Sequence, residues 1–130
     1  MKDLIIEKTS YTPTVKSFAD EGIMIIKGRL IPFEGYTFFK PILDWVHEYI
    51  EHPQEKTQFR IFTDSANTTS AKAIMMIFKD LDKIRESGYD VEITWYFDDE
   101  DDLEDWKSYT EFFEELSFEF IKVDEEPDLD

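Results

Sequence analysis

An apolar, strand-like run meets the most strongly patterned helix of the chain in the stretch Phe62-Thr63-Asp64-Ser65-Ala66-Asn67-Thr68-Thr69-Ser70-Ala71-Lys72. Before this stretch, Thr57–Thr63 alternates apolar and polar residues, which is the period of a strand. After it, apolar residues recur at helical spacing over Ala71–Leu81. The sequence therefore predicts a strand, a junction at 67–70 and a helix, which is the repeating unit of an α/β domain.

The same periodicities predict elements on both sides of this unit. Helices are expected near 36–51, from 71 to a stop at Gly88, and near 103–116. Strands are expected at Leu4–Thr9, Val15–Asp20, Ile23–Leu30, Thr57–Thr63, Val91–Phe97 and Phe118–Val123. The order β, β, β, α, β, α, β, α, β predicts the α/β class. It should be a single domain with a mixed, mostly parallel sheet, an N-terminal antiparallel hairpin and about three helices.

Length and composition agree with one domain. A chain of 130 residues, 42% of them apolar and 16% aromatic, can bury a substantial core. We expect residues 1–123 to form the domain and the acidic segment 124–130 to be a disordered tail. The acidic run 98–105 reads as a solvated loop that could dock a partner. It lacks the glycine and the ligand order of a calcium loop.

The charge of the chain restricts its partners. Thirty-one carboxylates against 14 basic side chains give a net charge of −17. Such a field repels the phosphates of nucleic acids and the anionic surface of a membrane, so we expect neither as a partner. A basic protein surface would instead be approached quickly, since complementary fields raise association rates.

Several kinds of site are not indicated. The chain has no cysteine, and His47 and His52 do not have the spacing of a helical metal pair. No glycine-rich phosphate loop is present, so we expect no metal and no cofactor. Residues 1–7 lack the apolar core of a signal peptide, and no apolar run reaches the roughly 20 residues that span a bilayer. We therefore expect a cytoplasmic protein.

The junction carries the candidate functional residues. Asn67, Thr68, Thr69 and Ser70 can each offer a side-chain oxygen to the unpaired N–H groups of a helix start. One cap needs fewer groups than this, so a second interpretation is that one hydroxyl accepts a phosphoryl group. Such a group would add about −1.5 to −2 charges beside the free N–H donors. The surface predicted to bind a partner consists of Asp64, Asn67, Thr69, Ser70 and Lys72.

Four segments, in order along the chain, carry a resemblance to a known family. They are Tyr11-Thr12-Pro13, the helical Leu43–Tyr49 with its Leu-Asp-Trp start, Asn67–Phe78, and Val91–Tyr96 followed by acids. Together they resemble the SiaC family of bacterial regulatory phosphoproteins. That family is similar in fold to the anti-sigma-factor antagonists called STAS domains. The four segments are spread over nearly the whole chain.

The resemblance implies a non-enzymatic protein that is switched by phosphorylation. By position, Thr68 is the phosphoacceptor, and Thr69 is a weaker candidate because the family often has Ser there. The implied partners are a Ser/Thr kinase of the histidine-kinase-like ATPase type and a PP2C-type phosphatase. A third implied partner is a diguanylate cyclase of c-di-GMP signalling, which the unphosphorylated form binds and activates.

Two other functions compete with this one. A phosphorelay receiver has a similar size and would use Asp64, which ends a strand, as its phosphoacceptor. Residues 7–10 do not supply the acidic pair that a receiver needs after its first strand. An enzyme with Thr68 or Ser70 as nucleophile would need a base, and Lys72 is the only nearby candidate.

Overall fold

The computed structural model describes residues 1–130 and contains six strands and three helices. The strands are β1 (Leu4–Ile6), β2 (Thr14–Phe18), β3 (Ile23–Leu30), β4 (Lys56–Ala66), β5 (Asp90–Phe97) and β6 (Ser117–Lys122). The helices are α1 (Gly35–Tyr49), α2 (Thr68–Glu86) and α3 (Glu100–Thr110). Their order along the chain is the one that the sequence predicts.

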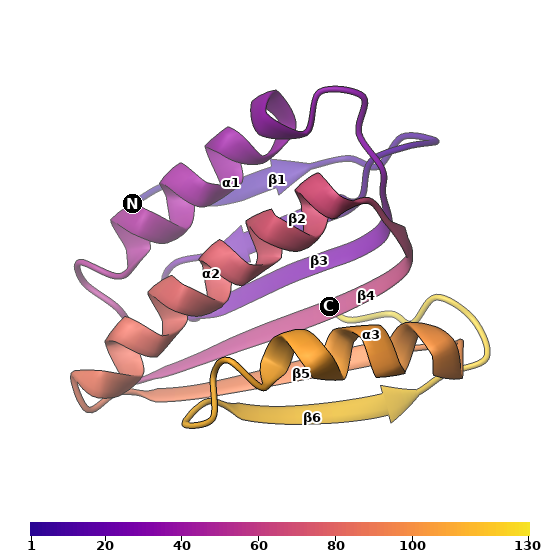
Figure 1. The fold of residues 1–130 in the computed structure, drawn as a ribbon. Helices are drawn as coiled ribbons and strands as arrows, with labels where there is room; N and C mark the ends of the chain where they lie inside the picture. Colours follow the sequence, from indigo (N-terminus) through magenta and orange to yellow (C-terminus); the bar gives the residue numbers. More distant parts are fainter.

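The six strands form one sheet in the order β1-β2-β3-β4-β5-β6. Pairing is antiparallel from β1 to β3 and parallel from β3 to β6, so the predicted mixed α/β fold with an N-terminal hairpin is confirmed. Each helix connects two neighbouring parallel strands, and all three helices lie on the same face of the sheet (Figure 1). Because β4 and β5 are parallel, α2 and α3 begin at the same edge of the sheet.

An aromatic cluster fills the space between the helices and the sheet. Phe78 of α2 is completely buried, and its ring centroid lies 5.2–6.0 Å from those of Phe59, Trp95, Phe113 and Phe118. All four contacts are edge-to-face, the arrangement that aromatic quadrupoles favour. This cluster fixes α2 above β4 and β5.

None of the three helices has the combination of length and apolar character that crossing a bilayer requires.

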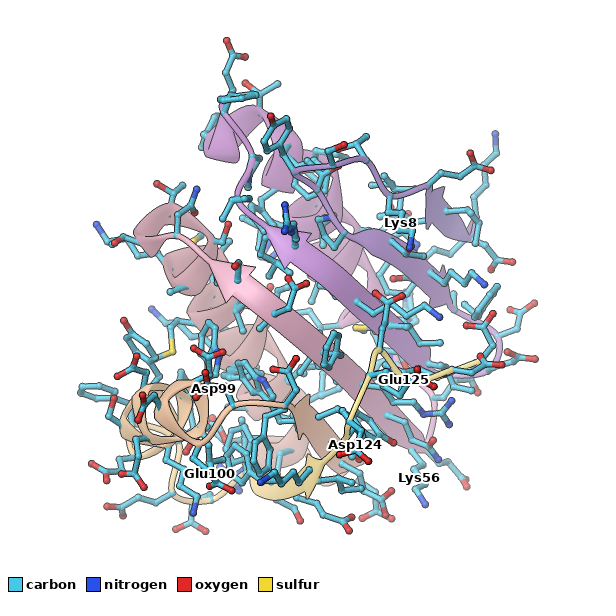
Figure 2. All side chains as sticks on the ribbon, turned by 90° about the vertical axis from the view of Figure 1, so that its right-hand side faces the viewer. Lys8, Lys56, Asp99, Glu100, Asp124 and Glu125 are labelled. Carbon is cyan, nitrogen blue, oxygen red and sulfur yellow. The ribbon has the colours of Figure 1, made fainter.

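Helix α3 begins earlier and ends earlier than the sequence predicts. The acidic run 98–105 is mostly its first turns rather than a loop, because the side chain of Asp99 accepts a hydrogen bond from the N–H of Asp101 at 2.8 Å. Carboxylates are favourable at this end of a helix, since the peptide dipoles make it partly positive. The start of α3, at Asp99 and Glu100, lies at the end of the molecule that faces the viewer in Figure 2.

The prediction of a disordered tail over residues 124–130 is wrong. The tail lies on the face of the sheet opposite the helices (Figure 2). Leu129 is 4% exposed and packs against Ile25 and Phe62 in a small second core. Glu126 lies 3.7 Å from the ammonium group of Lys8.

Basic side chains on the sheet hold the end of the tail. Arg60 Nη1 donates a hydrogen bond to the carbonyl oxygen of Leu129 at 2.8 Å. The ammonium group of Lys16 donates to the carboxylate of Asp130, and this hydrogen bond is the main cause that lowers the pKa of the Asp130 carboxyl. The acidic composition of residues 124–130 suggests disorder, but Lys16, Arg60 and the apolar contacts of Leu129 hold the tail on the sheet.

Replacing Leu129 with Asp should release the tail without unfolding the domain. The substitution puts a charge against the apolar side chains of Ile25 and Phe62, while the main core does not depend on the tail. Backbone order parameters measured by NMR should fall below about 0.6 over 124–130 and stay near about 0.85 in the strands. Asp124→Asn, at the exposed start of the tail, is the control. A wild-type tail that is already flexible would contradict the structure.

Candidate functional site

The junction between β4 and α2 is much tighter than the sequence suggests. Strand β4 runs to Ala66, so Asn67 is the only residue between the strand and the helix. The pairing with β3 shifts register at this point, and Asp64 has no partner opposite it. Thr63 Oγ1 stabilises this bulge, because it donates to the carbonyl oxygen of Ser65 at 2.8 Å and accepts from its N–H at 3.2 Å. The start of α2 is therefore fixed by the sheet.

Asn67 caps the helix alone. Its Oδ1 accepts a hydrogen bond from the N–H of Ser70 at 2.9 Å. Its own N–H donates to the carbonyl oxygen of Leu30 at 3.0 Å, and its Nδ2 donates to that of Pro32 at 3.4 Å. One asparagine thus satisfies the cap and ties α2 to the end of β3. The hydroxyls of the two following threonines are not needed for this purpose.

Thr68 and Thr69 are both exposed, but they face different neighbours. Thr69 lies against the start of α1, since a Cβ built on Gly35 would come 2.5 Å from its Cγ2. Thr68 lines an open cleft of about 280 Å³ between the start of α2 and helix α3. The hydroxyl of Thr68 can therefore be reached from solvent, whereas Thr69 is partly screened by α1.

The other predicted contact residues divide into exposed and buried ones. Lys72 and Asp64 are exposed, and the Asp64 carboxylate lies 4.0 Å from Arg29 Nε. Ser70 is completely buried, and its Oγ has no hydrogen-bond partner. The prediction of Ser70 as a partner-binding residue is therefore wrong, because the third position of this helix points into the core. The same burial removes Ser70 as a nucleophile.

The opposite wall of the cleft consists of residues that the sequence analysis did not assign to the site. They come from α3 and are Asp102, Asp105, Trp106, Ser108 and Tyr109. The order of the strands in the sheet is the signal that could have identified this wall. Because β4 and β5 are parallel neighbours, the helices that follow them start at the same edge, so the acidic run after β5 lies beside the junction after β4.

The electrostatic state of this wall is unfavourable for further negative charge. Partial burial raises the pKa of the Asp102 carboxyl, and the neighbouring carboxylates of Asp99, Asp98, Asp105 and Asp101 raise it further. No lysine, arginine or histidine lines the cleft. The carboxylates of α3 are therefore held near one another without a cation in the cleft to balance them.

Replacing Asp102 with Asn should stabilise the domain at neutral pH. The pKa of Asp102 is higher in the folded than in the unfolded protein, so the charged carboxylate costs stability above its folded pKa. That cost disappears as the pH falls through the folded pKa toward the unfolded value of about 3.9. Urea unfolding should show the gain at pH 7 and little gain near pH 4. Glu104→Gln, an exposed neighbour, should show no comparable gain, and equal gains in both variants would contradict this reasoning.

Comparison with known proteins places this fold and junction in a family. The sequence model of the SiaC family regulatory phosphoprotein matches residues 6–123. An uncharacterized protein of Pseudomonas aeruginosa strain UCBPP-PA14 is 29% identical over 98 residues, which is 75% of this chain and 78% of that protein.

Comparison with solved structures leads to the same family. Apo-SiaC of Pseudomonas aeruginosa is 28% identical and superposes with a TM-score of 0.77, covering 94% of this chain and 98% of that chain. SiaC in the complex of the diguanylate cyclase SiaD with its activator SiaC, also from Pseudomonas aeruginosa, is 27% identical, with a TM-score of 0.81. It covers 92% of this chain and 98% of that one. The chain therefore belongs to the SiaC family of regulatory phosphoproteins.

Proposed function

We propose that this protein is a switch in which phosphorylation of Thr68 controls binding to an effector protein. The observation that carries the proposal is the state of the Thr68 hydroxyl. It is exposed at the first position of α2, lines an open cleft, and is not used by the helix cap. A modifying enzyme can reach such an oxygen without unfolding the domain.

The local electrostatics suit a phosphoryl group on the helix side. The N–H groups of Thr68 and Thr69 are in the first turn of α2, where no carbonyl of the same helix can accept from them. The peptide dipoles also give this end partial positive charge. A phosphoryl group of about −1.5 to −2 charges is therefore accommodated by α2 itself. It changes the surface beside Thr69, Lys72 and Asp64, which we propose to contact the partner together with Asn67.

We propose three partners for the switch. A Ser/Thr kinase of the histidine-kinase-like ATPase type adds the phosphoryl group in the cytoplasm, and a PP2C-type phosphatase removes it. The effector is a diguanylate cyclase, by analogy with the SiaC–SiaD complex of Pseudomonas aeruginosa. In this proposal the chain itself catalyses nothing, and its unphosphorylated form is the activator. Thr69 remains the weaker candidate for the acceptor.

The competing receiver function has little support in the fold. Receivers share the flavodoxin-like strand order 2-1-3-4-5, whereas this sheet runs in sequence order with an antiparallel edge. Asp64 is the unpaired residue of a bulge, and its carboxylate lies 4.0 Å from Arg29 Nε rather than beside an acidic pair. Phosphorylation at the threonine is therefore the function that the geometry favours.

Replacing Thr68 with Ala should remove phosphorylation and leave the fold intact. The side chain makes no cap contact, so the change in stability should stay below about 0.5 kcal/mol. The wild-type protein and the variant are incubated with native cell extract and radiolabelled ATP, and incorporation is quantified. Thr69→Ala is the matched control and should be labelled like the wild type. Full labelling of Thr68→Ala, or loss of labelling only in Thr69→Ala, would show that the phosphoacceptor is a residue other than Thr68.

The effector can be tested by its own activity. Immobilised wild type and Thr68→Ala should retain, from native extract, a fraction that converts GTP to cyclic di-GMP. A protein that carries phosphothreonine at position 68 should retain at least about tenfold less, because charge enters the docking surface. Equal cyclase activity on all three proteins would show that the phosphoryl group does not control this partner. Activity on none would exclude a cyclase effector in that extract.

A further inference from the structure

The residue that we propose as the acceptor and the acidic start of α3 face the same cleft. Thr68 lies on one wall, and Asp102 and Asp105 lie on the other, which α3 forms together with Trp106 and Tyr109. Resting on the proposed function, we infer that a phosphoryl group on Thr68 repels these two carboxylates and loosens α3 from the sheet. The phosphoryl group would then alter a whole helix and not only its own position.

The charges around the cleft are negative, so their interaction with a phosphoryl group is repulsive. Every residue from 98 to 105 except Leu103 is acidic. The cations near this segment lie outside the cleft, since Lys122 pairs with Glu100 at 3.2 Å and Lys107 lies over the ring of Phe120. A phosphoryl group on Thr68 therefore meets carboxylates across the cleft, whereas Lys72, four residues further along α2, does not line the cleft. The N–H donors of α2 attract it from the other side, so the repulsion falls on α3.

Helix α3 is the element that can respond. Only Leu103 and Trp106 of its eleven residues are buried, whereas α2 buries eight. One of its two buried side chains, Trp106, packs against Trp95 of β5, with ring centroids 4.4 Å apart and the ring planes inclined at 36°. The helix also covers the end of the sheet that α1 and α2 leave free (Figure 1). Elements with few buried contacts are the first to open locally.

The coupling has a consequence for recognition. Trp106 and Tyr109 line the cleft and have ring centroids 5.6 Å apart. Displacement of α3 would change the shape of this aromatic wall, which a partner bound at Thr68 would also touch. Phosphorylation could in this way alter the surface on both sides of the cleft at once.

The test uses the full chain with phosphothreonine incorporated at position 68 during translation, so that no kinase is needed. Amide hydrogen exchange is compared with that of the unmodified chain. The expected result is exchange at least about fivefold faster over 100–110, with α1 unchanged. The tryptophan fluorescence of the chain should change in parallel, since Trp106 leaves its contact with Trp95. Sodium chloride near 1 M, where the Debye length is about 3 Å, should suppress most of the effect.

Two pairs of substitutions locate the interaction. Asp102→Asn with Asp105→Asn removes two charges from the cleft, and Asp101→Asn with Glu104→Gln removes two charges from the same helix outside it. Each pair is measured with and without phosphothreonine. The first pair should abolish the response to the phosphoryl group, and the second should retain it. An unchanged α3 in the phosphorylated chain, or an equal response in both pairs, would overturn the inference. Neither outcome depends on whether a kinase or a cyclase recognises the protein.

Discussion

The structure of the site depends on the hydrogen bond between Asn67 Oδ1 and the N–H of Ser70. This one bond caps α2, and the backbone of the same asparagine is bound to the end of β3 through Leu30. A cap formed by Thr68 would occupy the hydroxyl that we propose as the phosphoacceptor. Because asparagine takes this role, the sheet positions the helix and the first threonine stays free. Replacement of a capping residue by Ala typically costs about 1 kcal/mol, so this bond stabilises the helix as well as positioning it.

The two sides of the cleft have opposite electrostatic character. The start of α2 offers free N–H groups and partial positive charge, whereas the start of α3 carries carboxylates, one of which has a raised pKa. An uncharged threonine is compatible with both sides, but a phosphoryl group fits only the first. This asymmetry gives a physical reason why one modification could divide the protein into two functional states. Part of the net charge of −17 is concentrated in the α3 wall of this cleft, opposite the threonine that we propose as the acceptor.

Periodicity predicted the fold well because the elements obey it. The strands around Ile61 and Ile93 alternate, and the stripe from Ala71 to Leu81 has helical spacing, so the order of elements and the mixed sheet followed directly. The cluster of hydroxyls at the junction indicated the right place. Which member caps and which is buried could not be derived, since Ser70 and Thr69 differ only in their position around the helix.

Predictions from charge alone were less successful. The acidic run 98–105 was expected to be a loop, but the cap at Asp99 makes it a helix start. The acidic tail was expected to be disordered, but Leu129 finds an apolar site on the sheet. The helix cap in the first case, and the apolar contacts of Leu129 together with Arg60 and Lys16 in the second, give a structure that net charge alone does not predict.

We propose that the free hydroxyl of Thr68 is the oxygen that receives phosphate. The most direct test of this proposal is mass spectrometry of the protein isolated from its native cells, with fragmentation that maps each phosphoryl group to one residue. We expect a phosphorylated fraction whose phosphate lies on residue 68 and which disappears after treatment with a PP2C-type phosphatase. Phosphate found on Thr69, on Asp64 or elsewhere, with residue 68 unmodified, would contradict it.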